Sequence, residues 1–161
     1  MNALNVLRRT FRKLWRHSWK NWGLLLHAGT LTVSVRAGLS ISSLNRVTRT
    51  LRQVATALPQ WPVITPQYRL RAAWAARAVG RRLLPSRPCL TQALVLQYLL
   101  LRRGDGSAQL HIGVTKDGDG ALQAHAWVER DGRVLIGGTN APEMYEAFED
   151  LGAKIRDSTA P

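Results

Sequence analysis

The sequence has only one cysteine, Cys89, among its 161 residues. A single cysteine excludes an internal disulfide and any zinc site built from several thiolates. The thiol is therefore either a small core residue or a nucleophile, and a reducing compartment is expected. We predict a cytoplasmic protein that needs no cofactor.

Acidic residues are absent from the first 104 positions. That part holds 18 Lys or Arg, whereas residues 105–161 hold 5 basic and 10 acidic residues, and the net charge is +13. A basic half favours association with something acidic and does not determine a fold. Nucleic acid, an anionic membrane surface and an acidic peptide or protein are all open as partners. Because no zinc-finger spacing or RNA-binding aromatic motif is present, we expect no nucleic acid.

Long apolar runs are also missing. The longest candidate, residues 22–44, is interrupted by His27, by Arg36 and by repeated Ser and Thr, and falls short of the ~18 uninterrupted apolar residues of a membrane span. We therefore expect a soluble protein without a transmembrane segment. The Arg-rich N-terminus also has the composition of a targeting peptide, but its apolar spacing continues into a full-length helix.

The first 84 residues have helical spacing. Apolar residues recur every three, four or seven positions from Leu4 to Leu25, with basic residues off that stripe, which predicts a basic amphipathic helix. Such a helix could lie on a membrane or grip a partner, although a core-packing helix with a basic solvated face is the simpler interpretation. Further helices are expected at 24–44, where 31–35 also alternates like a strand, at 45–57 with Asn45 as N-cap, and at 67–84 after three loop prolines.

The second half changes its period. A helix is predicted from about Pro88 to Arg103. Alternating strands follow at 110–114, 121–129 and 133–136, with a tight Asp131-Gly132 turn, and then a short acidic helix from Glu143 to Leu151. The predicted fold class is α+β, a helical half followed by a helix packed on a small antiparallel sheet. We divide the chain into a basic helical subdomain, 1–84, for docking and core packing, and a catalytic core, 85–161, within one continuous domain.

Cys89 opens the apolar helix, and His125 lies 36 residues later in a predicted strand. A thiol reacts as the thiolate, and the free amides of a helix's first turn favour negative charge and can also bind an oxyanion. A strand packed on the nucleophile's helix would bring an imidazole base to the thiol. Each residue alone could be structural, but the pair makes Cys89 the candidate nucleophile and His125 the candidate general base. His111 competes for the base role but lies at the start of its strand.

The hairpin turn predicts a register for the last two strands. With Asp131-Gly132 as the loop, Gly138 falls opposite His125, and Gly137 falls opposite Ala126. A thiol protease is expected to keep an Asp or Asn near this place to hold the second imidazole nitrogen. This chain has two glycines there.

The group that orients the imidazole must therefore come from elsewhere. Asn140 is the closest amide in sequence and is our candidate orienter. A backbone carbonyl, a water molecule or Glu143 could serve instead. Glu129 is about 13 Å from His125 at strand rise, which is too far for direct contact.

Three motifs follow one another in order: the run from Pro88-Cys-Leu-Thr-Gln to Gly104, then Leu110-His-Ile-Gly-Val114, then Ala124-His-Ala-Trp-Val-Glu129 with Asp131-Gly-Arg-Val134. As an ordered set covering about residues 80–138, they resemble the lasso-peptide leader peptidases, which are transglutaminase-like cysteine proteases of the papain-like superfamily. The resemblance implies removal of a leader from a ribosomally made precursor, before a separate ATP-dependent, asparagine-synthetase-like cyclase closes a macrolactam. It also implies a separate PqqD-like protein that recognises the leader, because residues 1–80 have no pattern for such a domain.

In this resemblance Cys89 matches the family nucleophile and His125 the family base. The Asp of many relatives aligns with about Gly137 and is absent. A Cys–His dyad or a substitute orienter would remain, and an inactive homologue that only carries the precursor would also fit this absence. We expect a stand-alone leader peptidase. Acyl transfer to an amine would use the same residues, and a non-catalytic basic helical module that binds nucleic acid or membrane is a competing hypothesis from a different class.

Overall fold

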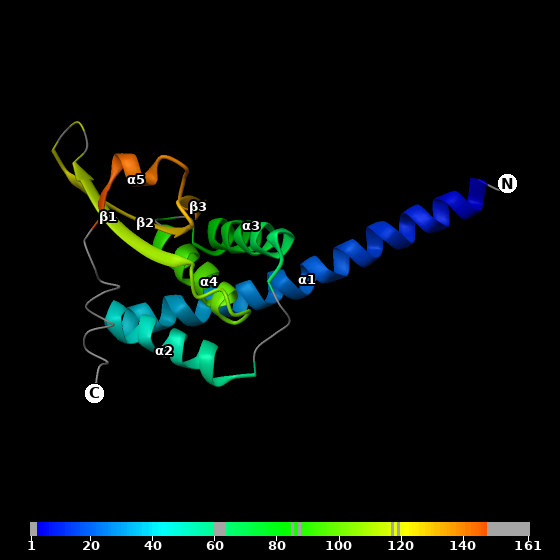
Figure 1. Ribbon diagram of the computed structural model, residues 1–161, viewed down its shortest axis with the longest axis horizontal. Helices are drawn as coiled ribbons and strands as arrows, with labels where there is room; N and C mark the ends of the chain where they lie inside the picture. Colours follow the sequence, from blue (N-terminus) through cyan, green and yellow to red (C-terminus); the bar gives the residue numbers. More distant parts are fainter. Residues whose placement is uncertain are drawn as a thin grey trace.

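The computed structural model describes residues 3–59, 64–84, 86, 88–116, 118 and 120–147, and their side chains from Trp22 onward except that of Glu146. It has the α+β architecture expected from the sequence, with helices preceding a small antiparallel sheet (Figure 1). The elements are α1 (Ala3–Ile41), α2 (Leu44–Ala57), α3 (Pro66–Leu83), α4 (Cys89–Leu101), β1 (Gln109–Lys116), β2 (Leu122–Arg130), β3 (Arg133–Ile136), α5 (Ala141–Met144) and β4 (Glu146–Ala147).

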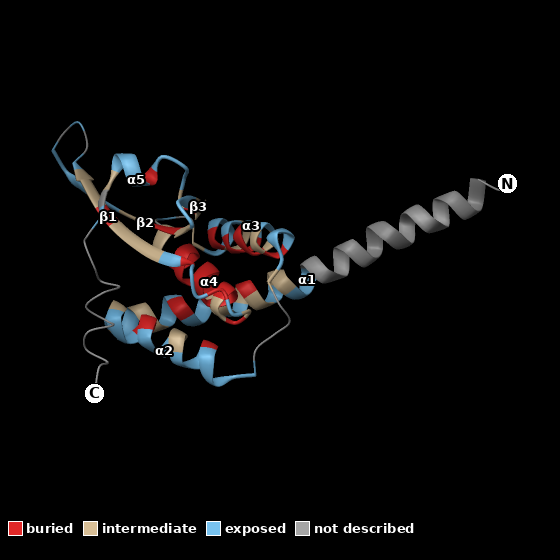
Figure 2. Ribbon diagram, viewed as in Figure 1, coloured by how far each residue is buried: buried red, intermediate tan, exposed pale blue. Residues whose placement is uncertain are grey.

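The helix α4 is the centre of the fold. It packs against α1, α2 and α3 and against β1, β2 and β3, so it lies between the sheet and the other helices (Figure 1). All ten residues from Thr91 to Leu100 are buried, and Figure 2 shows this helix almost entirely in the colour of buried residues. A helix that is apolar on every side is stable in water only when it is enclosed in this way.

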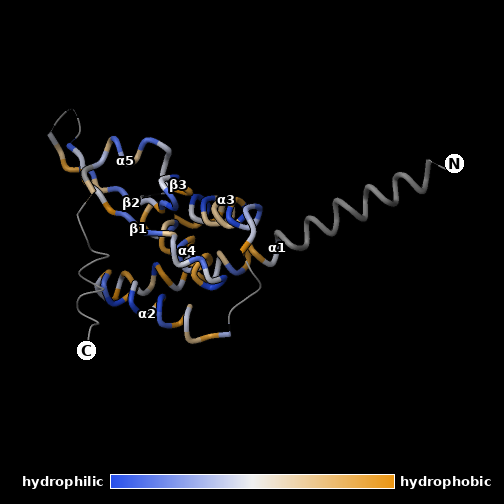
Figure 3. Tube along the Cα trace, viewed as in Figure 1, coloured by the Kyte–Doolittle hydropathy of each residue, from blue (hydrophilic) through white to orange (hydrophobic). Residues whose placement is uncertain are grey.

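The ambiguous stretch 24–44 is helical up to Ile41, as part of α1. Its strand-like alternation is a helix face: Ala28, Thr32 and Val35 are buried in the core, whereas Val33 is exposed. The Thr32 hydroxyl donates to the carbonyl of Ala28 at 2.7 Å, so the buried polar group is satisfied inside the helix. Figure 3 shows hydrophobic and hydrophilic residues alternating along the described part of this helix. The stripe predicted from Leu4 lies mostly outside the residues whose side chains are described.

The helix boundaries depart slightly from the sequence pattern. Ser43, and not Asn45, occupies the N-cap of α2, because only two residues separate this helix from α1. The helix α3 begins as its sequence suggests, since Pro66 is in its first turn and Thr65 Oγ1 accepts from the amide of Tyr68 at 3.2 Å.

The strand order in the sheet is β3-β2-β1-β4, and all described pairings are antiparallel. The three predicted strands are confirmed, and β4 is an addition. The predicted helix from Glu143 to Leu151 is wrong within the described residues, because α5 starts at Ala141 and ends at Met144. Tyr145 is extended, and β4 pairs with Gly113 and Val114 of β1.

The predicted register of β2 with β3 is wrong beyond its first two pairs. Arg130 pairs with Arg133, and Glu129 with Val134, as the turn predicts, but Val128 then pairs with Ile136. Leu135 is therefore the extra residue of a β-bulge, which shifts the register by one position. The pairing ends at Ile136, so Gly138 is not opposite His125 and Gly137 is not opposite Ala126.

One segment of α1, Trp22–Ile41, is long and apolar enough by length and composition to cross a membrane. Core helices of soluble proteins meet the same criterion, and so do N-terminal signal sequences. The buried face of this segment packs in the core with α4. The absence of a transmembrane segment stays a prediction.

Candidate active site

Cys89 is the first residue of α4 and directly follows Pro88. It is half-buried, and its thiol makes no hydrogen bond with the residues that the structure describes. The first helical bond of this turn runs from the amide of Gln92 to the carbonyl of Pro88 at 2.9 Å. The amides before Gln92 precede the regular helical hydrogen bonds, so the nucleophile position predicted from the sequence has donor groups around it.

The first turn of α4 is fixed by contact with the end of α3. The Gln92 side chain is buried and donates from Nε2 to the carbonyl of Arg77 at 3.4 Å. A Cβ atom added to Gly80 would lie 2.6 Å from Gln92 Nε2 and 2.9 Å from Cδ. A larger residue at position 80 would therefore displace the Gln92 side chain from the carbonyl of Arg77, so the glycine allows α3 to pack closely on the helix of the candidate nucleophile. One signal of this contact is visible in the sequence, a glycine inside an Ala- and Arg-rich helix.

His125 lies in the middle of β2, and its Nε2 is 2.5 Å from the carbonyl oxygen of Gly137. A carbonyl can only accept a hydrogen bond, so we assign the proton of the neutral ring to Nε2. Nδ1 is then left as the acceptor. A general base requires such an unprotonated ring nitrogen, and the main-chain carbonyl of Gly137 stabilises this tautomer.

Gly137 could not carry a side chain in this position. Its φ is +111°. An added Cβ would lie 2.8 Å from the Cα of Trp127 and 3.0 Å from the carbonyl oxygen of Ala126, and nearer still to Trp127 Cβ. Gly137, which the resemblance aligns with the Asp of many relatives, thus packs closely against β2. Its carbonyl contacts the His125 imidazole in place of a carboxylate.

Tyr145 stacks on the ring of His125. Their ring centroids are 4.8 Å apart and the rings are inclined by 25°. Gly113 of β1 pairs with His125 on one side and with Ala147 of β4 on the other. Since directly paired residues point to the same face, His125 and Ala147 share a face on which Gly113 has no side chain. The sequence did not reveal Tyr145, because it lies in the predicted acidic helix.

Asn140 is at the N-cap position of α5, exposed, and its Oδ1 accepts from Thr139 Oγ1 at 3.1 Å. No hydrogen bond joins it to His125 among the described residues. Its role as orienter stays a prediction. Glu143, the other side chain considered, lies in the only turn of α5 and is exposed.

His111 is paired with Trp127, not with His125, and its ring stacks on the indole with centroids 5.5 Å apart. This contact gives it a packing role next to the site. Glu129 pairs with Gln109 at the other end of β2, away from the His125–Gly113 pair.

The helix that carries Cys89 packs directly on the strand that carries His125. Ala126 and Val128 of that strand belong to the same buried cluster as the leucines of α4. Because side chains alternate along a strand, His125 lies on the other face of β2, where it stacks on Tyr145. Among the described residues no hydrogen bond joins the thiol to the imidazole. The structure thus does not bring these two side chains into hydrogen-bond contact. No group of three or more His, Cys, Asp or Glu that could hold a metal ion is found in the described part of the chain.

A buried carboxylate ties the strand of His125 to the helices. Asp105, in the loop after α4, accepts from Arg69 Nε of α3 at 2.7 Å, from Arg130 Nε of β2 at 3.0 Å, and from Ser107 Oγ at 2.7 Å. Burial alone would raise the pKa of Asp105, but the hydrogen bonds from Ser107, Arg69 and Arg130 together lower it below its usual value. The ionised carboxylate therefore connects three segments around the site.

Comparison with known proteins gives one family. A model of the transglutaminase-like superfamily matches residues 29–152, a range that contains Cys89, His125 and Gly137. No curated protein and no solved structure matches the chain. Enzymes of this superfamily are generally of the cysteine-protease type. With more than half of its length matched, and with a helix-opening cysteine followed by a strand histidine, the chain belongs to the transglutaminase-like superfamily.

Proposed function

We propose that this protein is a cysteine peptidase that cleaves the leader from a ribosomally made lasso-peptide precursor before the macrolactam is closed. One observation carries the peptidase assignment. The His125 ring is held by the Gly137 carbonyl with Nδ1 left as the acceptor, and the other face of its strand, at Ala126 and Val128, packs on the helix that Cys89 opens. The leader as substrate rests on the resemblance of the three motifs around these residues.

In the proposed reaction, His125 Nδ1 takes the proton of the Cys89 thiol, and the sulfur attacks the carbonyl carbon of the scissile bond. Free amides at the start of α4 stabilise the resulting oxyanion. The C–N bond then breaks, and the imidazolium gives its proton to the departing amine. Water attacks the thioester and gives a proton to Nδ1, and the sulfur leaves and is reprotonated. The products are the leader with a free carboxylate and the core peptide with a free amine.

The Gly137 carbonyl has the orienting role in this scheme. It fixes the tautomer and the ring plane, as a triad carboxylate does. A neutral dipole stabilises an imidazolium less than a full negative charge does. The stacked ring of Tyr145 limits rotation of the imidazole from another direction.

The helical half supports a stand-alone peptidase with separate partners. Up to Leu83 the described residues form helices only, whereas a PqqD-like recognition domain needs short strands as well. We propose that a separate PqqD-like protein presents the leader and that the asparagine-synthetase-like cyclase takes the freed core. The basic residues of 1–84 would dock the leader, the recognition protein or the cyclase.

The test is leader release from purified precursor, measured by mass spectrometry in the presence of the recognition protein, with and without cyclase and ATP. Wild type should release the leader, and Cys89→Ala and His125→Ala should not. Release that survives Cys89→Ala would contradict the thiol mechanism. His111→Ala is the matched control, because it removes the neighbouring histidine and should leave most activity.

Acyl transfer is the second candidate, because the superfamily includes enzymes in which an amine resolves the same thioester. The mass of the released leader, measured without any added nucleophile other than the partner proteins, separates the two outcomes. A leader that ends in a carboxylate indicates hydrolysis, and a leader joined to an amine of the core or of a partner indicates acyl transfer.

A further inference from the structure

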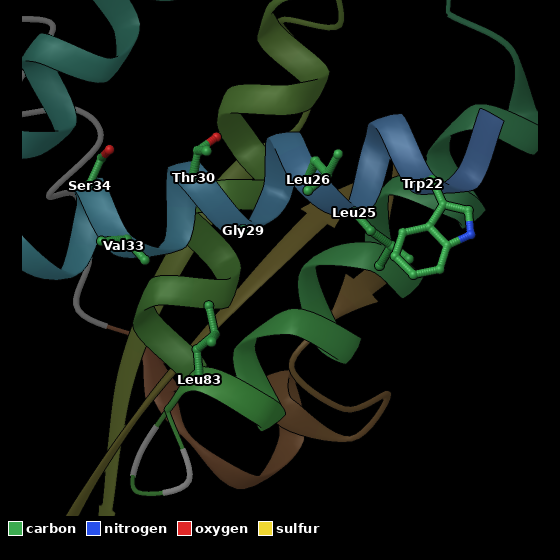
Figure 4. A pocket seen from close by; sticks show the side chains of 8 residues that line it. All are labelled: Trp22, Leu25, Leu26, Gly29, Thr30, Val33, Ser34 and Leu83. Carbon is green, nitrogen blue, oxygen red and sulfur yellow. The ribbon is translucent and has the colours of Figure 1, made fainter. Parts of the chain in front are cut away.

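We propose that the exposed apolar face of α1 docks on an anionic membrane surface, with the helix lying in the plane of the lipid headgroups. This face forms one side of an open groove of about 540 Å³, and Leu83 from the end of α3 forms the other side (Figure 4). We call it the α1 groove. Its larger apolar lining residues are Trp22, Leu25, Leu26, Val33 and Leu83.

The α1 groove is part of a continuous exposed stripe. Trp22, Leu26, Val33 and Ile41 are between 61% and 84% exposed, and their spacings of four, seven and eight place them on one side of a helix. Leu83 adds another exposed side chain, at 50%. Large apolar side chains that gather in this way on a folded surface mark an interaction site.

The buried face of α1 determines the orientation in which the helix can bind a membrane. Ala28, Thr32 and Val35 are almost completely buried, and His27 packs edge-on against Tyr98 of α4 with ring centroids 6.1 Å apart. A helix whose one side is occupied by the protein core cannot be surrounded by lipid. The segment Trp22–Ile41, which has the length and composition of a membrane span, would therefore lie on the surface and present only its exposed side.

The positive charge around the α1 groove favours an anionic bilayer as its binding partner. No carboxylate lies in the first 104 residues, and Arg36 of α1 and Arg81 and Arg82 next to Leu83 are exposed. Arginines that flank an exposed tryptophan and leucines match a layer of anionic headgroups over acyl chains. The 20 residues from Trp22 to Ile41 extend over roughly 30 Å in a helix. A straight apolar stripe of that length matches the flat surface of a bilayer better than the curved surface of a small acidic protein.

The test is flotation of the full-length protein with vesicles of phosphatidylcholine, alone or with phosphatidylglycerol added. We expect binding only when the anionic lipid is present, and release as salt is raised. The double variant Leu26→Gln, Val33→Gln should lower the partition coefficient at least about tenfold. Leu122→Gln is the matched control, because this leucine of β2 is 71% exposed but belongs to another surface. Thermal unfolding of all three proteins verifies that they are folded.

Equal vesicle binding by wild type and the double variant would overturn the proposal, and so would equal binding to neutral and anionic vesicles. A wild-type protein that ignores vesicles but binds an acidic partner protein through Leu26 and Val33 would assign the α1 groove to that protein instead. Peptidase activity is not part of the readout, so the proposal stands or falls independently of the proposed function.

Discussion

The imidazole Nε2 of His125 lies 2.5 Å from the main-chain carbonyl oxygen of Gly137. A main-chain group therefore occupies the place where thiol peptidases are expected to have an acid or amide side chain. The carbonyl neither titrates nor rotates about a side-chain bond. The orientation of the candidate base consequently depends on the backbone path of residues 136–138, which follow the bulge at Leu135.

Gly137→Ala should lower both stability and activity. Left-handed strain together with the clash against Trp127 should cost about 3 kcal/mol of unfolding free energy, and leader release should fall sharply because the carbonyl moves. Denaturant unfolding and the mass-spectrometric assay measure the two effects. Gly138→Ala is the matched control: its φ is +98°, but nothing lies within 4 Å of an added Cβ, so we expect only about 1 kcal/mol. Equal losses in both variants would show that the contact with Trp127 is unimportant.

Asn140→Ala separates the two candidate orienters. If Asn140 orients His125, turnover should fall at least about tenfold, as expected for a lost positioning contact in the transition state. Because the Gly137 carbonyl already holds Nε2 and the Asn140 side chain bonds Thr139, we expect the rate to stay near that of wild type. A tenfold fall in kcat would transfer the role to Asn140.

Tyr145→Ala should lower kcat between about twofold and tenfold, the range of a single aromatic contact. KM should change little, since the ring acts through His125 and not on the substrate. Tyr145→Phe keeps the ring and should keep the rate. A Phe variant as slow as the Ala variant would indicate that the hydroxyl matters and not the stack.

Asp105→Asn should lower the free energy of unfolding by about 2 kcal/mol, because a buried acceptor of two guanidinium groups loses its charge. The lowered pKa of Asp105 means that this stabilisation is complete above the unfolded pKa near 3.8 and is lost as pH falls through the folded value. The variant should lack this acid-dependent loss in unfolding curves. Asp131→Asn is the control, since Asp131 is 63% exposed and its substitution should change stability by less than about 0.5 kcal/mol.

His27→Phe should remove a loss of stability at mildly acidic pH. Burial, with a smaller contribution from Arg102, lowers the pKa of His27 below its ordinary 6.5. The unfolded chain therefore binds a proton that the folded chain does not, and wild-type stability should fall as pH drops below 6.5. Phenylalanine keeps the edge-on contact with Tyr98 and has no proton to bind. The measurement is the melting temperature of both proteins between neutral pH and pH 5. The same slope of melting temperature against pH in the two proteins would contradict this expectation.

The helices and the three main strands could be predicted because their apolar periods are long and regular. The bulge at Leu135 could not, since the turn residues Asp131 and Gly132 determine only the first pairs of the hairpin. The segment after Asn140 was also misassigned. Its helix contains only four residues, and the strand that follows exists because β1 offers a free edge, which is tertiary information.

The candidate nucleophile and base were visible in the sequence because their chemistry depends on residue type. The orienting group was not, because every residue has a carbonyl. The glycine at 137 carried the only trace, because it marks a place where the backbone approaches another segment closely. Gln92, Gly80 and Tyr145 were missed for a similar reason, since each acts through a contact with a distant element.

If His125 is the base, its orientation by the peptide backbone also determines which mutations can abolish the activity of this protein. Where an aspartate holds the imidazole, one codon change removes it and leaves the fold intact. Here no side-chain replacement deletes the carbonyl of residue 137, and the ones that disturb it disturb the sheet as well. In this arrangement, a homologue that is folded but inactive would arise most simply by substitution of Cys89 or His125.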